Sequence, residues 1–354
     1  MFKLAVLPGD GIGQEVTEHA LKVLTAVKTK YDLALTYRLG LIGGKAIDEI
    51  GDPFPQETQE LVAQSDAVFL GAVGGPKWDS PEKKVRPEQG LLAIRKALRL
   101  YANLRPVQCW PQLIEQSPFK KEKIEGVNLL IVRELTGGAY FGARGTEIKN
   151  GERKAFDTIE YSAEEIRRLV KVAFKLAGQR RKKLTSVDKA NILETSRLWR
   201  KIVLEEAANY PEITLNHLYV DNCAMQLCLN PGQFDVLATE NTFGDILSDQ
   251  ASVLGGSLGM LPSASIGDGP ALYEPVHGSA PDIAGQNKAN PLAAILSVAM
   301  MLRISLSCFE AALAIEKAVG RVLEQGLRTA DIWAPGCIRV GTSALVDAVI
   351  KELN

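Results

Sequence analysis

The sequence is poor in the residues that build metal-thiolate and disulfide sites. It has five cysteines, an odd number with no C-x-x-C pair, and only three histidines among 354 residues. Cys223 and Cys228 are close together, but they lack the further Cys or His ligands of a structural zinc site. We therefore expect reduced thiols in a cytoplasmic protein, with neither a zinc site nor a disulfide framework.

Long apolar segments and a strong net charge are also missing. The longest apolar run, PLAAILSVAMML from Pro291 to Leu302, is too short to span a bilayer and predicts a buried helix. The chain starts on the strand-like FKLAVLPG, so no signal peptide is expected. The net charge of -1 gives no field that favours nucleic acid, and the basic run RRKK at 180–183 is more typical of a solvated turn. Neither nucleic acid nor a membrane is expected as a partner.

The most informative absence concerns positive charge. From Ile202 to Asn287 there is no Lys or Arg, against eleven Asp and Glu. Within this stretch Asp245 and Asp249 stand four apart in the helical pattern NTFGDILSDQAS, where like charges face each other and cost roughly a few tenths of a kcal/mol. The helix follows the strand-like FDVLATEN, and open α/β sheets bind ligands at the carboxyl ends of strands. Carboxylates without nearby cations suit Mg²⁺ or Mn²⁺, so a divalent-metal site is predicted, with Asp221 as third ligand; a solvated acidic face is the alternative.

Strand-like and amphipathic helical segments alternate along most of the chain. The strand-like segments include KLAVL, DAVFLGAV, NLLIVREL, TSVD, HLYVDN and FDVLATEN. Helices are expected around residues 14–31, 88–102, 163–176, 195–208 and 243–254. This order predicts an α/β fold with a mostly parallel sheet. The Gly-rich, polar segment GAYFGARGTEIKNGERKAFDTIEYS interrupts the pattern, and its N-G turn at 150–151 predicts a projecting β arm over about 139–160.

A Gly-rich loop near the start, LPGDGIGQE, follows a strand and opens a helix. Its glycines have the spacing G-x-G-x-G at Gly9, Gly11 and Gly13, which differs from the G-x-G-x-x-G of dinucleotide-binding loops. A tight strand-to-helix turn that needs backbone freedom is therefore favoured over a pyrophosphate cradle.

Three arginines near the ends of expected elements predict a carboxylate-binding site, because a planar guanidinium pairs well with carboxylates. These are Arg95, Arg105 and Arg133. In PEQGLLAIR, Glu88, Leu91, Leu92 and Arg95 share one side of a helix. Taken singly, each Arg is more often a surface residue and each Leu more often part of a core.

Several long motifs resemble the decarboxylating β-hydroxyacid dehydrogenases, the family of the isocitrate and isopropylmalate dehydrogenases. They are RPEQGLL, LYANLRP, VRELTGGAYFG, SVDKANILETSRLWR, YVDNCAMQL, ENTFGDILSDQAS and YEPVHGSAPDIAG, and the likeness runs from LPGDGIG to GTSALVDAV. The resemblance implies a non-Rossmann fold of two α/β domains that share a large mixed sheet, with the active site in the cleft between them. Residues 1–100 plus 255–354 would form the cofactor-binding domain. Residues 101–254, with the β arm, would bind metal and substrate and form the dimer.

The same resemblance assigns roles to the residues already singled out. The three arginines would hold the substrate's carboxylates, Asp221, Asp245 and Asp249 would bind Mg²⁺ or Mn²⁺, and Tyr140 and Lys189 would be the acid–base pair. Glu88, Leu91 and Leu92 would line the side of the pocket that receives the substrate's apolar group. In a homodimer with shared active sites, Lys189 and Asp221 would come from the neighbouring subunit.

A second motif would bind the cofactor, which the resemblance implies is NAD. The loop embracing the adenosine would consist of His277, Gly278, Ser279, Ala280, Pro281, Asp282, Ile283, Ala284 and Gly285, with Asn290 nearby. Asp282 would hydrogen-bond the ribose hydroxyls and repel a 2′-phosphate, so NAD⁺ is expected over NADP⁺. The loop from Gly75 to Glu88, with Pro76, Lys77 and Trp78, would lie along the nicotinamide.

The activity implied is oxidative decarboxylation of (2R,3S)-3-isopropylmalate to 4-methyl-2-oxopentanoate and CO₂, a step of leucine biosynthesis. The alternatives are sibling enzymes for methylthioalkylmalate, homoisocitrate, isocitrate or tartrate. Isocitrate enzymes carry Ser and Asn in place of the Glu88 and Leu91 side of the pocket, so that substrate is disfavoured. A non-catalytic relative would be expected to lack Lys189, Tyr140 or an Asp ligand, and all are present.

Overall fold

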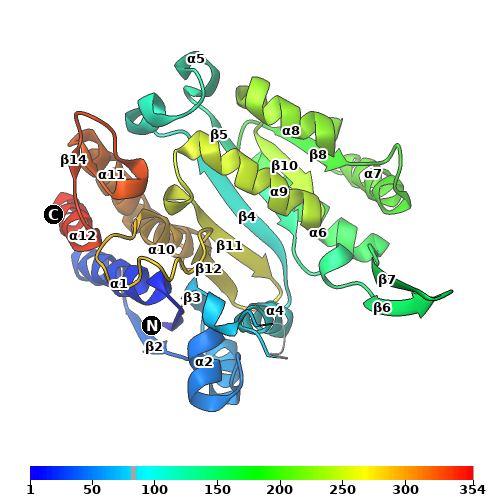
Figure 1. Cartoon of the computed structure of the whole chain (residues 1–354). Coiled ribbons are helices and arrows are strands. Elements are labelled where there is room, and N and C mark those ends of the chain that lie inside the picture. Colours follow the sequence, from blue (N-terminus) through cyan, green and yellow to red (C-terminus); the bar gives the residue numbers. More distant parts are fainter. Residues whose placement is uncertain (81–84, 354) are drawn as a thin grey trace. The chain divides into compact units, whose positions relative to one another are not determined.

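The computed structural model describes residues 1–80 and 85–353, and these fall into two compact units (Figure 1). The first unit contains Met1–Leu100, Cys109–Pro118 and the residues from Val253 onward; the second contains Tyr101–Gln108 and Phe119–Ser252. Residues 109–118 lie in the first unit, although the sequence placed them with the second domain. They pack there because Leu113 and Ile114 are buried and the Gln112 carbonyl accepts a hydrogen bond from Arg328 Nη2 at 3.0 Å.

The first unit is built on five strands in the order β2-β1-β3-β12-β11. The strands are β1 (Phe2–Gly9), β2 (Leu35–Leu39), β3 (Ala67–Ala72), β11 (Pro262–Gly267) and β12 (Ala271–Pro275). All neighbouring pairs are parallel except β11 with β12. The helices are α1 (Ile12–Lys30), α2 (Gly43–Ile50), α3 (Gln56–Ala63), α4 (Pro87–Ala97), α10 (Leu292–Ile304), α11 (Phe309–Glu324) and α12 (Thr342–Leu353). Shorter elements are β13 (Leu327–Arg328), β14 (Ile338–Arg339) and the 3₁₀ turns η1 (Pro76–Trp78), η2 (Pro111–Gln116), η5 (Val253–Gly255), η6 (Leu258–Met260) and η7 (Ala330–Ile332).

The second unit is built on five strands in the order β4-β5-β10-β8-β9. They are β4 (Leu100–Gln108), β5 (Asn128–Glu134), β8 (Lys183–Asp188), β9 (Thr214–Tyr219) and β10 (Val236–Thr239). Here β4 and β5 are antiparallel and the other pairs parallel. The helices are α5 (Lys121–Ile124), α6 (Ala163–Gly178), α7 (Glu194–Ala207), α8 (Val220–Leu229) and α9 (Asn241–Ser252), with 3₁₀ turns η3 (Gly138–Tyr140) and η4 (Pro231–Gln233). The predicted α/β class and mixed sheet are confirmed.

One predicted helix was too long. The helix expected over 88–102 ends at Ala97, and β4 begins at Leu100. The stretch KALRLYANL suits either structure, because alternating burial along β4 leaves Leu100 and Ala102 inside while Tyr101 is half-buried. By contrast, α10 is buried along almost its whole length, as its apolar composition predicted.

The β arm predicted from the N-G turn is a hairpin of β6 (Arg144–Lys149) and β7 (Glu152–Asp157), which extends from the second unit in Figure 1. Asn150 and Gly151 have φ of 54° and 77°, as a two-residue type I′ turn requires. Every residue of both strands is exposed. A two-stranded hairpin is marginally stable by itself, so this arm needs packing against something else.

The Gly-rich loop after β1 forms the tight turn that its spacing favoured. Gly9 has φ 71°, and a Cβ there would lie 1.9 Å from the Ala72 carbonyl oxygen. The Asp10 carboxylate accepts hydrogen bonds from the backbone N–H groups of Gly44, Lys45 and Gly74, at 2.8, 2.8 and 2.9 Å.

Within the described ranges, no helix has the length and apolar character needed to cross a membrane.

Candidate active site

Helix α9 begins with a buried carboxylate cap. Glu240 precedes the helix and accepts hydrogen bonds from the N–H groups of Thr242 (3.1 Å) and Phe243 (2.6 Å). A carboxylate at a helix N-terminus satisfies donors that have no partner inside the helix and interacts well with the helix dipole. Burial raises the pKa of Glu240 in spite of these hydrogen bonds. The cap fixes where the first turn of α9 starts, and thereby the direction of its polar face.

The like-charged pair on α9 finds its counter-charge on the neighbouring strands. Asp245 and Asp249 have side chains that are 33% and 61% exposed. Arg105 of β4 reaches both, with Nη2 3.5 Å from Asp245 Oδ1 and Nη1 3.2 Å from Asp249 Oδ1. Arg133 of β5 donates a charged hydrogen bond to Asp245. Two guanidinium groups therefore neutralise two carboxylates on one surface of the second unit.

A buried asparagine holds each of these two arginines. Asn241 Oδ1 accepts from both Nε (3.0 Å) and Nη2 (2.7 Å) of Arg133, and Asn103 Oδ1 accepts from Arg105 Nε at 2.9 Å. Both asparagines are 1% exposed. Each arginine thus donates to a buried amide oxygen through its Nε, so its orientation does not depend on the aspartates alone.

Tyr140 joins this cluster from the 3₁₀ turn η3. Its hydroxyl donates to Asp245 Oδ2 at 3.0 Å, and the Arg133 guanidinium lies 5.7 Å from its ring centroid. Partial burial, and then the negative charge of Asp245, raise the pKa of Tyr140. The phenol therefore stays protonated at neutral pH, and its hydroxyl is a hydrogen-bond donor within the cluster.

Lys189 and Asp221 form a separate pair in the second unit. Lys189 Nζ lies 2.6 Å from Asp221 Oδ1, and this hydrogen bond lowers the pKa of Asp221. The residues that the structure describes contain no group of three His, Cys, Asp or Glu side chains placed to share one metal ion. Among these residues, Asp221 thus does not complete a three-ligand site with Asp245 and Asp249, and its contribution to a second subunit's site stays a prediction.

The α9 carboxylates nonetheless fit a hard divalent cation. Arg105 contacts both of them, Asp245 through Nη2 and Asp249 through Nη1, so the two carboxylates lie on the same surface. Mg²⁺ binds through one or two carboxylates and keeps its remaining positions for water and substrate oxygens. Asp245 and Asp249 would supply the protein oxygens, and the predicted metal role of Asp221 requires a second copy of the chain.

The third predicted arginine lies in the first unit. Arg95 Nη2 is 3.1 Å from Glu274 Oε1, and both side chains are 12% exposed. Its Nε is buried and has no hydrogen-bond partner in the described part of the chain. On the same helix, α4, Glu88 is exposed and Leu91 and Leu92 are half-buried. Such leucines are available to line a pocket, and their role toward substrate stays a prediction.

The predicted cofactor loop follows β12 in the first unit. His277 Nδ1 lies 3.0 Å from the Gly278 carbonyl oxygen, while its Nε2 is buried without a described partner. Burial lowers the pKa of His277, so the ring is neutral and Nε2 is an acceptor that lacks a donor. The exocyclic amine of adenine is such a donor, and the exposed Asp282 is available to ribose hydroxyls. These features fit a nucleotide.

Other members of the predicted cofactor set are held by the protein itself. The Ser279 carbonyl accepts the Ile12 N–H at 2.7 Å, which docks the loop on the start of α1. Asn290 is 7% exposed; its Oδ1 accepts the Leu292 N–H at 3.0 Å and its Nδ2 donates to Asp331 Oδ2 at 3.0 Å. The Asn290 side chain therefore accepts a hydrogen bond from the first residue of α10, and both of its polar atoms are hydrogen-bonded within the first unit.

In the predicted nicotinamide loop, Gly75 precedes η1, which contains Pro76, Lys77 and Trp78. Lys77 Nζ lies 2.5 Å from Asp48 Oδ2, and Trp78 Nε1 donates to Asp48 Oδ1 at 3.2 Å. These contacts hold the first part of the loop on α2. Residues 81–84 of the same loop lie outside the described residues.

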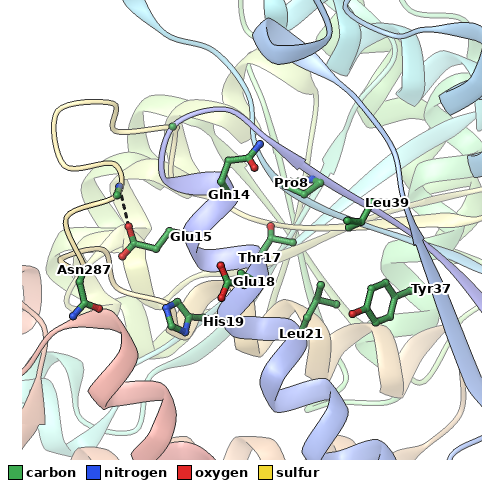
Figure 2. A pocket seen from close by; sticks show the side chains of 12 residues that line it. Pro8, Gln14, Glu15, Thr17, Glu18, His19, Leu21, Tyr37, Leu39 and Asn287 are labelled. Carbon is green, nitrogen blue, oxygen red and sulfur yellow. Dashed lines mark hydrogen bonds between the residues drawn. The ribbon is translucent and has the colours of Figure 1, made fainter. Parts of the chain in front are cut away.

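A cavity of about 620 Å³ borders the end of the predicted cofactor loop (Figure 2). It is lined by residues of α1 and β2 together with Gly285 and Asn287, and Glu15 Oε2 accepts the Gly285 N–H at 3.1 Å. Gly285 is the one residue of the predicted cofactor set among those lining it. The cavity therefore gives no independent support for the predicted adenosine position.

Comparison with known proteins identifies the family. The family model described as isocitrate/isopropylmalate dehydrogenase matches residues 3–349. The chain belongs to this family. Its sequence is 58% identical to the 3-isopropylmalate dehydrogenase of Aquifex aeolicus, over 100% of this chain and 97% of that protein, and 59% identical to that of Geobacillus kaustophilus, over 98% and 94%. The resemblance seen in the motifs is confirmed, and the protein is an oxidoreductase.

The fold agrees with solved structures of the same family. An isocitrate dehydrogenase from Methylococcus capsulatus superposes with a TM-score of 0.89 at 36% identity, covering 100% of this chain and 99% of that one. The isocitrate/isopropylmalate dehydrogenase fold expected from the motifs is therefore confirmed.

Sequence reasoning missed the residues that support the family's arginines and the acidic helix. Asn241, Asn103 and Glu240 were not singled out, nor was Ser248, whose hydroxyl accepts from Arg105 Nη1 at 2.6 Å. The one available signal was the pair Glu240–Asn241 directly before an apolar helical pattern, which is typical of a helix start. Such a pattern predicts a cap and says nothing of an arginine contributed from another strand.

Proposed function

We propose that this protein catalyses the NAD-dependent oxidative decarboxylation of (2R,3S)-3-isopropylmalate to 4-methyl-2-oxopentanoate and CO₂, a step of leucine biosynthesis. The support from similarity is that relatives covering nearly all of the chain at 58% and 59% identity bear the name 3-isopropylmalate dehydrogenase. The support from the structure is one cluster, in which Asp245 receives hydrogen bonds from Arg133 and Tyr140 and lies 3.5 Å from Arg105.

The charges of this cluster suit a malate and a divalent cation together. Two arginines balance two aspartates in the chain alone. A divalent ion would balance Asp245 and Asp249, and the substrate's two carboxylates would balance Arg105 and Arg133. When metal and substrate bind, the aspartates and arginines would thus change their ion-pair partners, and no charge would be left unpaired. This matters because an unpaired charge in a partly buried site is costly. Arg95 is the predicted third arginine of the clamp.

Two side chains, Lys189 and Tyr140, are proposed to transfer protons. Lys189 would accept the proton of the C2 hydroxyl, and NAD⁺, held by the predicted loop from His277 to Gly285, would supply the acceptor for the hydride from C2. The 2-oxo acid then loses the C3 carboxylate as CO₂, and Tyr140 donates a proton to C3. The place of Tyr140 in the cluster supports this role, because its hydroxyl donates to Asp245 Oδ2 at 3.0 Å, beside the proposed metal and substrate. A bound Mg²⁺ or Mn²⁺ supplies Lewis-acid stabilisation of the negative charge that develops on the substrate's oxygens.

Cofactor choice rests on the loop from His277 to Gly285. His277 Nε2, buried and without a described donor, would accept from the adenine amine. Asp282 is exposed, and its carboxylate would bind ribose hydroxyls and repel a 2′-phosphate. NAD⁺ is therefore the proposed acceptor.

The proposed assembly is a homodimer in which Lys189 and Asp221 serve the neighbouring subunit's site. Apolar side chains on α8 and α9 support it: Met225, Leu229 and Ile246 are 52%, 53% and 61% exposed. Large apolar side chains gathered on two adjacent helices are typical of an interface. The fully exposed β arm, which needs a packing partner, gives a second reason.

The test is NADH absorbance with NAD⁺, Mg²⁺ or Mn²⁺, and a panel of 3-isopropylmalate, a methylthioalkylmalate, homoisocitrate, isocitrate and tartrate. The highest kcat/KM is expected for 3-isopropylmalate, with NAD⁺ preferred over NADP⁺. A sibling activity is the second candidate, since an isocitrate dehydrogenase shares the fold at 36% identity. A higher kcat/KM for any other acid on the panel would replace the proposal with that activity.

A further inference from the structure

Asn241 is a buried side chain beside the proposed substrate site that makes three hydrogen bonds. It is 1% exposed and lies at the first position of α9. Its Oδ1 accepts two hydrogen bonds from Arg133, at 3.0 and 2.7 Å, and its Nδ2 donates to the Gly137 carbonyl oxygen at 3.0 Å. One amide thus connects α9, strand β5 and the segment that leads into η3.

These three hydrogen bonds define the orientation of the Asn241 amide and the groups that it holds in place. Turning the amide over would direct NH₂ at the N–H groups of Arg133 and oxygen at a carbonyl, so only one orientation satisfies all three groups. Gly137 directly precedes the 3₁₀ turn Gly138–Tyr140, which carries Tyr140. Asn241 therefore sets the position of the Arg133 guanidinium relative to Tyr140.

The division of hydrogen bonds on Arg133 is informative. Nε and Nη2 are directed at Asn241, while Nη1 is directed at Asp245 on the outer surface of the cluster. A guanidinium has five N–H groups in a rigid fork, so fixing one edge also fixes the direction of the other. The edge that faces a carboxylate in the chain alone is the edge that would meet a substrate carboxylate.

The start of α9 is fixed by other groups. Tyr161 Oη donates to Glu240 Oε2 at 2.9 Å and accepts the Asn241 backbone N–H at 3.0 Å, and Glu240 caps the first turn. An Asn241→Ala substitution keeps all of these hydrogen bonds, because they involve the Asn241 backbone or other residues. It removes only the contacts to Arg133 and Gly137.

We propose that Asn241 is a positioning residue of the dicarboxylate site, which acts by holding the Nη1 edge of Arg133 toward the substrate carboxylate and beside Tyr140. This inference rests on the proposed function. Losing the hydrogen bonds to a charged group should weaken 3-isopropylmalate binding about tenfold to a hundredfold. NAD⁺ affinity should stay within about twofold, because the predicted cofactor loop belongs to the other unit.

The experiment measures the dissociation constant of 3-isopropylmalate by calorimetry, with Mg²⁺ and without cofactor, so that no turnover occurs. Asn241→Ala and the milder Asn241→Ser are compared with Tyr161→Phe, a control that disturbs the same helix start without touching Arg133. Asn241→Ala is then repeated in an Arg133→Lys background. Positioning through Arg133 predicts that most of the loss disappears there, since a double-mutant cycle isolates coupling between contacting residues.

Each outcome decides a different point. A substrate-affinity loss specific to the Asn241 variants and absent beside Arg133→Lys supports the inference. An equal loss in Tyr161→Phe, a loss that persists in the Arg133→Lys background, or unchanged affinity in both Asn241 variants overturns it while leaving the proposed function intact. Failure of the wild-type protein to bind 3-isopropylmalate at all would refute the proposed function instead.

Discussion

Replacing the two aspartates of α9 one at a time separates their structural role from their proposed metal role. Asp245 accepts hydrogen bonds from Arg133 and Tyr140 and lies 3.5 Å from Arg105. The side chains of Arg105 and Arg133 are 11% and 4% exposed. Among the residues that the structure describes, the Asp249 carboxylate has one partner, Nη1 of Arg105, and its side chain is 61% exposed. Asp245→Ala removes the carboxylate that both largely buried guanidinium groups contact, while Arg105 keeps its ion pair with Asp249. Asp249→Ala removes a mostly solvated partner.

The expected costs differ because the burial differs. Removing one member of a fully buried ion pair costs about 3–5 kcal/mol. Since a third of the Asp245 side chain is exposed, we discount this to about 2–3 kcal/mol for Asp245→Ala in the metal-free protein. Asp249→Ala should cost about 0–1 kcal/mol, the usual range for an exposed pair. A difference of about 2 kcal/mol is roughly a thirtyfold change in the unfolding equilibrium.

The assay is urea unfolding in the presence of a chelator. Trp199, which is 2% exposed, is the one tryptophan of the second unit, so its fluorescence reports that unit once the other three tryptophans are replaced by Phe. Metal-dependent activity should fall strongly in both variants, whereas stability should fall mainly in Asp245→Ala. Equal stability losses, or a larger loss in Asp249→Ala, would refute the reasoning from burial and charge.

Three further predictions concern the proton-transfer groups and pH. Lys189→Met should abolish turnover while NAD⁺ binding by calorimetry stays nearly unchanged; full activity would defeat the assignment. Tyr140→Phe should lower kcat about a hundredfold or more with little change in the unfolding midpoint, and a first-turnover burst of NADH should persist, because oxidation precedes protonation of C3. All three histidines have pKa values lowered from 6.5, chiefly by burial, so the unfolded chain binds more protons below pH 6.5 and stability should fall as pH drops through that value. His217→Leu should flatten this slope in urea midpoints measured between about pH 5 and 7, and an unchanged slope would contradict the cause.

The sequence anticipated the acidic helix better than it anticipated its partners. The absence of Lys and Arg around Asp245 and Asp249 was interpreted as a divalent-metal site, which stays a prediction, and in the structure the counter-charge comes from arginines outside the segment. Which cations supply it depends on strand order, because β4 and β5 are far from α9 in sequence but adjacent to it in the fold. Arg105 and Arg133 were predicted to bind substrate, and their pairing with the aspartates in the chain alone was not foreseen.

Helix and strand positions followed local pattern wherever one face was clearly apolar. The helices expected around 163–176 and 195–208 correspond to α6 (Ala163–Gly178) and α7 (Glu194–Ala207). The overrun at Leu100 occurred where strand β4 follows helix α4 without an intervening Gly or Pro. The supporting role of Asn241 could not be read from the sequence, because a polar residue at a helix start has the same local pattern whether or not it also holds an arginine.

The most direct test of the central claim is the rate of NADH formation from 3-isopropylmalate and NAD⁺ with Mg²⁺, with EDTA, and after Mn²⁺ is added back. If Asp245 and Asp249 bind a divalent ion that holds the malate, the rate should fall to background with EDTA and return with Mn²⁺, and Asp249→Ala should show no recovery although it remains folded. An undiminished rate in EDTA would contradict the claim.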